Sequence, residues 1–103
     1  MMMAAVTIRQ IKPGTYEQFR EAWQPDPWYP QLRNALILRH QDDPEQVLTV
    51  GFLDLDADAA DALRDDPEIL RAEEARLRRI APFEERVLLN GVYEVSEEVT
   101  APW

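Results

Sequence analysis

The sequence predicts an α+β domain with the ferredoxin-like order β-α-β-β-α-β, a four-stranded antiparallel sheet and helices on one face of it. Two apolar runs, residues 35–38 and 47–53, are short, rich in β-forming residues and separated by turn residues, which predicts a hairpin. Helical periodicity lies on both sides of this hairpin, and a further strand is expected near each end. We expect residues 1–103 to form one domain.

The first strand is expected over residues 4–11. Val6 and Ile8 face one way and Thr7 and Arg9 the other, which is the alternation of a half-buried strand. This alternation predicts that the two apolar side chains of the strand point toward the core.

A helix is expected from Thr15 to about Gln24. Thr15 followed by Gln18 matches a capping box, in which two side chains satisfy free amides of the first turn. Aromatic residues then recur at the spacing of one helix face: Tyr16, Phe19 and Trp23. This face is expected to pack against the sheet.

A proline-rich loop, residues 25–30, cannot continue that helix because proline fixes φ and removes an amide donor. Strands are expected next over residues 35–41 and 46–55. The turn between them, residues 42–45, has the length and composition of a hairpin connection.

The second helical region is interrupted by Asp65-Asp66-Pro67. Asp56 or Asp58 is expected to cap a first helix over residues 57–64. Asp66, with Pro67 in the first helical position, is expected to begin a second helix that ends at about Ile80. The buried face predicted for this helix contains Ile69, Leu70, Leu77 and Ile80.

The last strand is expected over residues 86–95. Alternation assigns one face of this strand to Val87, Leu89 and Val95, and the other face to Leu88 and Val92. A polar tail follows it.

The hairpin strands are apolar on both faces, whereas a strand with one wet face should alternate. The predicted helices cover only one face of the sheet. The bare face would form an apolar patch larger than soluble monomers usually expose. We therefore expect a C2 homodimer through the open sheet face.

Composition excludes several classes of function. The net charge of −9 disfavours nucleic acid as a partner, because no basic stripe offsets it. The absence of cysteine and the single histidine argue against a transition-metal site, and no phosphate-binding glycine motif is found, so neither metal nor cofactor is expected. No run is long enough to cross a membrane and residues 1–5 do not resemble a signal peptide, so a cytoplasmic protein is expected.

Residues 13–19 at the start of the first helix and Ile80-Ala-Pro-Phe83 before the last strand resemble the dimeric α/β-barrel superfamily, and within it the antibiotic biosynthesis monooxygenase-like group. The resemblance implies two sheets that face each other across a dimer and a ligand pocket between helices and sheet. Its oxygenases often combine an Asn, a Trp and a His. No three positions here match that set, since His40 is the only histidine and Asn90 lies on the last strand.

Candidate site residues come from three groups: the single histidine, aromatic residues, and arginines that could hold a ligand carboxylate. His40 is the only side chain with an ordinary pKa near neutrality and is the candidate catalytic base, although a structural role at a strand end beside Asp42 and Asp43 is the commoner one for such a histidine. Aromatic residues of the first helix and the proline loop could wall an apolar pocket or fill the core. The candidate ligand-binding residues are Trp23, Trp28, Tyr29, Arg39 and Asn90.

Two functions follow from these residues. The first is a small homodimeric monooxygenase-like enzyme, or a binder of a small apolar or aromatic molecule. The alternative is a non-catalytic homodimer that senses a ligand or serves as an assembly module. A cavity of several hundred Å³ lined by Trp23, Trp28 and His40 would favour the first, and a solidly packed gap between helices and sheet would favour the second.

Overall fold

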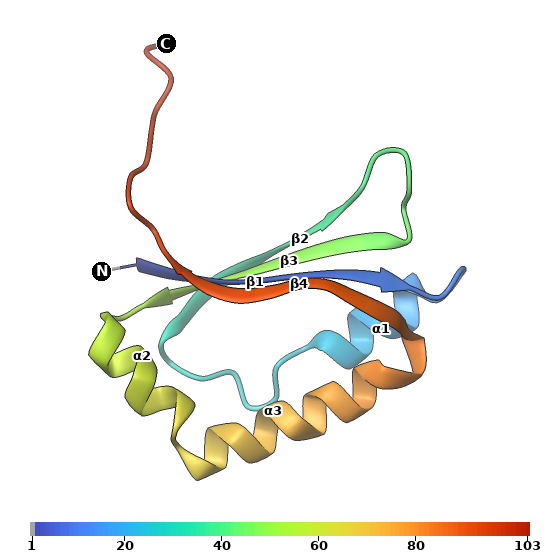
Figure 1. Cartoon of the computed structure of the whole chain (residues 1–103), viewed down its shortest axis with the longest axis horizontal. Coiled ribbons are helices and arrows are strands. Elements are labelled where there is room, and N and C mark those ends of the chain that lie inside the picture. Colours follow the sequence, from blue (N-terminus) through green and yellow to red (C-terminus); the bar gives the residue numbers. More distant parts are fainter. Residues whose placement is uncertain (1) are drawn as a thin grey trace.

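The computed structural model describes residues 2–103, except for the side chain of Ala57. Four strands form one antiparallel sheet in the order β2-β3-β1-β4, with β1 in the interior beside β3 and β4 (Figure 1). The strands are β1 (Met2–Ile11), β2 (Leu32–Arg39), β3 (Gln46–Asp54) and β4 (Glu84–Glu94). The ferredoxin-like arrangement expected from the sequence is thereby confirmed, with the second helical region divided in two.

Three helices lie on the same face of this sheet (Figure 1). They are α1 (Tyr16–Trp23), α2 (Ala57–Arg64) and α3 (Pro67–Ile80), and a single 3-10 turn, η1 (Ala81–Phe83), leads into β4. Both predicted aspartate caps are confirmed. Asp56 Oδ1 accepts a hydrogen bond from the Ala59 amide at 2.8 Å, and Asp66 Oδ1 accepts one from the Glu68 amide at 2.9 Å.

The capping box predicted at Thr15 does not form. The Thr15 hydroxyl donates instead to the Lys12 carbonyl at 2.6 Å, and no side chain caps α1. The reason lies in the turn before the helix, where Gly14 adopts a positive φ of 75°. This turn folds the chain back so that the Lys12 carbonyl is within reach of the Thr15 hydroxyl.

The core between helices and sheet consists of two clusters. Under α1 and the end of α3, four large side chains are fully buried: Ile11, Phe19, Val47 and Ile80. Near α2 the buried residues are Met3, Leu32, Leu53 and Leu55. The aromatic face predicted for α1 is confirmed, since Phe19 and Trp23 are buried and Tyr16 packs against them.

The two faces of β1 are the reverse of the sequence prediction. Arg9 is only 3% exposed and pairs with the fully buried Val47 of β3 on the helix-covered face. Val6 and Ile8 therefore lie on the opposite face. Alternation within the strand was correctly predicted, but it could not tell which face the helices cover.

Two further face assignments were wrong. Val87 pairs with Arg9 and Leu89 pairs with Ile8, so these residues of β4 lie on opposite faces, because a register shift inserts Leu88 between them. On α3, Ile80 is fully buried as predicted, but Leu70 and Leu77 are 44% and 49% exposed. Ile80 packs with Phe19 and Trp23 of α1, whereas Leu70 and Leu77 belong to neither core cluster.

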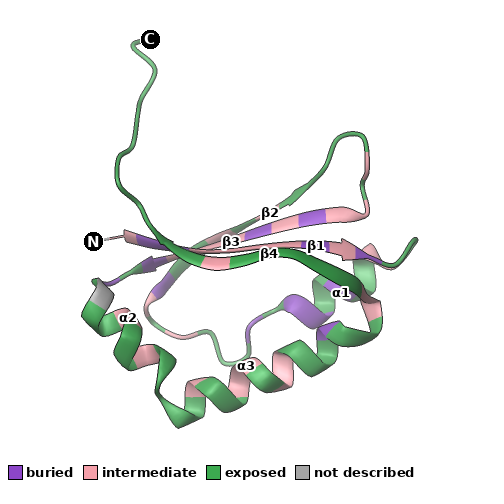
Figure 2. Ribbon diagram, viewed as in Figure 1, coloured by how far each residue is buried: buried purple, intermediate pink, exposed green. Residues whose placement is uncertain are grey.

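The sheet surface away from the helices is apolar and uncovered, and we call it the open face. Its most exposed large residues are Leu36 (50%), Leu38 (48%), Leu89 (37%) and Tyr93 (50%). Figure 2 shows β4 exposed along most of its length, in contrast to β1 and β3. Within residues 2–103 we find no helix long and apolar enough to cross a membrane.

Candidate functional site

A cavity of about 380 Å³ lies between α3 and the helix-covered face of β1 and β4. Thr7 and Arg9 alternate along β1, so both side chains point toward the helices. Glu73, Arg76 and Leu77 are three and four positions apart and therefore share one face of α3. The complete lining consists of Thr7, Arg9, Glu73, Arg76, Leu77, Glu84, Val87 and Asn90. We call this space the α3–sheet cavity.

Arg9 is the most buried charged group of the cavity. Its Nε donates to Glu84 Oε2 at 2.9 Å, and Nη1 makes a longer contact of 3.5 Å with the Thr49 hydroxyl. The guanidinium also lies 5.8 Å from the centre of the Phe19 ring. Burial lowers the pKa of Arg9 below its usual value, and the hydrogen bond to Glu84 opposes this shift.

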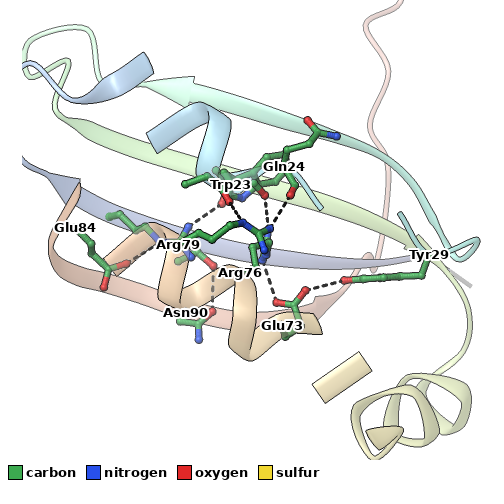
Figure 3. A network of polar contacts seen from close by, with 12 residues as sticks. Trp23, Gln24, Tyr29, Glu73, Arg76, Arg79, Glu84 and Asn90 are labelled. Atoms are coloured by element: carbon green, nitrogen blue, oxygen red, sulfur yellow. Dashed lines mark hydrogen bonds and ion pairs between the residues drawn. The ribbon is translucent and has the colours of Figure 1, made fainter. Parts of the chain in front are cut away.

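Arg76 links α3 to the end of α1. Its Nη2 donates to Glu73 Oε2 at 3.1 Å and its Nη1 donates to the Trp23 carbonyl at 3.1 Å, while the guanidinium lies 5.4 Å from the centre of the Trp23 ring. Arg76 Nε is buried and has no hydrogen-bond partner among the described residues. Figure 3 shows Arg76 between Trp23 and Glu73.

Glu73 also receives a hydrogen bond from the proline-rich loop. The Tyr29 hydroxyl donates to Glu73 Oε1 at 3.4 Å, so that Glu73 lies between Tyr29 and Arg76 (Figure 3). Burial raises the pKa of Tyr29 above its usual 10.0, and the negative charge of Glu73 adds to this effect. The loop is thereby tied through Glu73 and Arg76 to α3 and to the end of α1.

Asn90, predicted from the sequence as a ligand-binding residue, lines the α3–sheet cavity. It pairs with Thr7 across β1 and β4, and the Thr7 hydroxyl donates to Asn90 Oδ1 at 3.1 Å. Trp23 borders the network through its carbonyl and ring but is itself 6% exposed and packed in the core. Tyr29 reaches the network through its hydroxyl.

Trp28 lies outside the α3–sheet cavity. Its indole Nε1 donates to the Leu32 carbonyl at 2.9 Å, which fixes the ring in the loop. Trp28 and Tyr29 line a second hollow of about 310 Å³ beside the start of α3, together with Leu63 and Ile69 among others. The sequence grouped these two aromatics with Trp23, but the loop turns Trp28 away from it.

The two predicted residues at the end of β2 also lie elsewhere. His40 Nδ1 accepts hydrogen bonds from the amides of Asp42 and Asp43 at 3.0 and 3.2 Å, in the hairpin turn. The Arg39 guanidinium lies 4.0 Å from the centre of the Tyr16 ring, and its Nε donates to the Pro44 carbonyl at 2.8 Å. Both residues contribute to a hollow of about 140 Å³ that includes apolar side chains of the open face.

The structure does not bring Trp23, Trp28 and His40 around one of the cavities found within the described residues. The catalytic role of His40 and the ligand-binding roles of the other predicted residues stay predictions. Among residues 2–103, no group of three or more potential metal-binding side chains is found.

Sequence reasoning missed three charged residues of the cavity: Glu73, Arg76 and Glu84. A usable signal was present on α3, because residues 73, 76 and 77 share a face with the fully buried Ile80. For Glu84 the sequence offers no such signal, because its partner Arg9 is 75 residues away.

Searches with protein-family models and against curated proteins found no match. Solved structures with the same fold include SnoaB, a cofactor-independent oxygenase from Streptomyces nogalater, with a TM-score of 0.68, 13% identity, and coverage of 97% of this chain and 98% of that one. A protein from Chloroflexus aurantiacus J-10-fl, provisionally named an antibiotic biosynthesis monooxygenase, has a TM-score of 0.66, 12% identity, and coverage of 96% and 98%.

A third structure, from Nitrosomonas europaea and also provisionally named an antibiotic biosynthesis monooxygenase, has a TM-score of 0.61 and 21% identity, with coverage of 89% of this chain and 88% of that one. At these identities the likeness establishes the fold and leaves the reaction open. The chain therefore has the ferredoxin-like fold of the antibiotic biosynthesis monooxygenase-like proteins. The resemblance predicted from the sequence is confirmed at this level.

Proposed function

We propose that the protein is a homodimer that binds a small organic molecule in the α3–sheet cavity of each subunit. The observation that carries this proposal is the cavity itself, about 380 Å³ in volume and lined by polar side chains from both the sheet and α3. Small-molecule sites commonly have volumes from about 300 Å³ upward and place a few polar groups on a mainly preformed wall.

The lining suits a molecule with both apolar and polar parts. Leu77 and Val87 provide apolar contact, while Arg9, Glu84 and Asn90 provide hydrogen-bonding groups. The sequence led us to expect an apolar or aromatic ligand. Together with the polar lining, this expectation favours a ligand with a flat organic ring that carries at least one hydrogen-bonding group.

The open face supports the homodimer. It presents four large side chains that are each more than a third exposed, and pairing with a second copy would bury them. Contiguous exposed apolar surfaces commonly mark sites of protein–protein contact. The proposal retains the cytoplasmic location expected from the sequence.

The experiment that tests ligand binding uses an aromatic probe and a variant that fills the cavity. We expect 2-naphthamide to bind the wild-type protein in calorimetric titration, and Val87→Phe to weaken its binding by about tenfold because the larger ring occupies the cavity. Val99→Phe adds the same ring in the tail, where Val99 is 85% exposed, and should leave binding unchanged. Equal binding by all three proteins would place the probe elsewhere and contradict the proposal.

A second candidate function is a cofactor-independent oxygenase, which the likeness to SnoaB favours. Such an enzyme needs an electron-rich substrate that can itself reduce dioxygen. The test is oxygen uptake with 1,5-dihydroxynaphthalene in the presence of the protein. Uptake that depends on the wild-type protein and is lost in Val87→Phe supports the oxygenase. Ligand binding without oxygen uptake supports a non-catalytic ligand sensor.

A further inference from the structure

The charged groups around the α3–sheet cavity form two ion pairs, so their formal charges cancel. Arg9 is joined to Glu84 at 2.9 Å, and Arg76 to Glu73 at 3.1 Å. The two arginine side chains are 4% and 16% exposed, and the two carboxylates 24% and 32%. Each enclosed cation therefore has its own carboxylate, and the lining carries no net formal charge.

This pairing works against an anionic ligand. A ligand carboxylate that approached Arg9 would lie beside Glu84, and one that approached Arg76 would lie beside Glu73. Two carboxylates in such proximity repel each other, and displacing a glutamate would leave its charge in a partly buried position without a partner. A neutral ligand meets neither cost.

Two donor groups of the lining lack an acceptor among the described residues. Asn90 Oδ1 is engaged by Thr7, whereas the Asn90 amide nitrogen has no hydrogen bond to a described residue. Arg76 Nε, on a side chain that lines the cavity, is buried without an acceptor. A ligand that satisfies these groups must offer an acceptor oxygen.

We propose that the α3–sheet cavity selects an uncharged molecule that carries an acceptor oxygen, such as a carboxamide, ketone or ester, over the corresponding carboxylate. Glu84 sets this preference because it neutralises Arg9. This inference rests on the proposed ligand-binding function and adds the chemical class of the ligand.

The experiment compares probes that differ only in charge: 2-naphthamide with 2-naphthoate, and benzamide with benzoate. We expect each amide to bind the wild-type protein about tenfold more tightly than its carboxylate in calorimetric titration at neutral pH. In Glu84→Gln the carboxylates should bind about tenfold more tightly than to wild type, because Arg9 is no longer neutralised, while amide binding should change little.

The net charge of −9 also repels anions from the whole protein, so a control for long-range charge is needed. Glu85→Gln makes the same change in net charge at an exposed position next to the cavity residue. It should leave the ratio of amide to carboxylate affinity as in the wild type. If Glu84→Gln does not fold by circular dichroism, Glu73→Gln neutralises the other carboxylate of the cavity and carries the same expectation.

Equal affinity of amide and carboxylate for the wild-type protein would overturn the inference while leaving ligand binding intact. An equal response of Glu84→Gln and Glu85→Gln would overturn the role of Glu84. If the folded wild-type protein bound neither member of either pair, the proposed ligand-binding function would be contradicted, and the inference would fall with it.

Discussion

The guanidinium of Arg9 on β1 and the carboxylate of Glu84 on β4 lie 2.9 Å apart, although 75 residues separate them in the sequence. Arg9 is 3% exposed, so its charge is almost completely removed from water. A buried cation is tolerated only with a partner of opposite charge and satisfied hydrogen bonds. This pair ties the last strand to the first at the floor of the α3–sheet cavity.

Glu84→Ala should destabilise the protein by about 2 kcal/mol, because it leaves Arg9 buried without its partner. This value lies below the usual loss for a fully buried pair, since the Glu84 side chain is 24% exposed. Urea denaturation monitored by circular dichroism measures the change. Glu85→Ala, at an exposed neighbouring position, should alter stability by less than about 0.5 kcal/mol. Equal stability of the two variants would show that the ion pair does not stabilise the fold.

The stability of the protein should decrease as the pH rises above 10. The folded Tyr29 has a pKa raised above its usual 10.0 by burial and by Glu73, so the folded state retains a proton that the unfolded state releases. The contribution is fully present below pH 10 and is lost as the pH rises through the folded pKa. The free energy of unfolding, measured below pH 10 and at a series of higher pH values, detects the loss.

Tyr29→Phe removes the titrating phenol and should reduce this loss of stability at alkaline pH. Near neutrality its effect should be small, because the hydrogen bond to Glu73 is long at 3.4 Å. The other tyrosines are retained in the variant and serve as an internal control for general alkaline denaturation. An identical alkaline profile for wild type and Tyr29→Phe would assign the loss to other groups.

Leu38→Glu should convert the protein from a dimer to a folded monomer. Leu38 is 48% exposed on the open face, and a carboxylate within an apolar interface would be desolvated without a partner. Sedimentation at micromolar concentration should give about twice the chain mass of 12.0 kDa for the wild type and the single-chain mass for the variant. Leu70→Glu makes the same change on α3, where Leu70 is 44% exposed, and should remain a dimer. A monomeric wild type would refute the homodimer.

Asp66→Ala should lower the free energy of unfolding by about 1 kcal/mol, because the Glu68 amide at the start of α3 loses its acceptor. Asp65→Ala removes a carboxylate at the preceding position, whose side chain has no such hydrogen bond among the described residues. It should therefore cost much less. Thermal or urea denaturation of the two variants gives the comparison, and equal losses would assign the effect to charge instead of capping.

Local signals in the sequence were sufficient for the order of the elements. Proline and glycine at 13, 14 and 67, the aspartates at 56 and 66, and the apolar hairpin runs act over a few residues, and the structure confirms the elements they predict. Face assignments were less reliable. Arg9 and Val6 alternate correctly along β1, but the side of the sheet that the helices cover depends on contacts with α1 and α3.

The candidate site, too, was predicted only in part from the sequence. Of the residues named from the sequence, Asn90 lines the α3–sheet cavity and Trp23 accepts a hydrogen bond from Arg76 through its carbonyl. His40, Arg39 and Trp28 do not line this cavity. Glu84 could not be predicted, because only the pairing of β4 with β1 brings it to Arg9. The spacing of Glu73, Arg76 and Ile80 in the sequence places them on one face of a helix. It indicates a site only when the face of α3 that contacts the core is known.

The sequence by itself determined the strands, the helices, the two aspartate caps and the apolar character of both sheet faces, because these depend on residue type and short-range periodicity. Tertiary structure decided which side of the sheet is covered, where Leu88 disturbs the register, and which charges meet in the cavity. These features depend on packing between residues far apart in the chain. Arg9, which the alternation of its strand predicted to be exposed, is a buried cation, and Glu84 of β4 neutralises its charge.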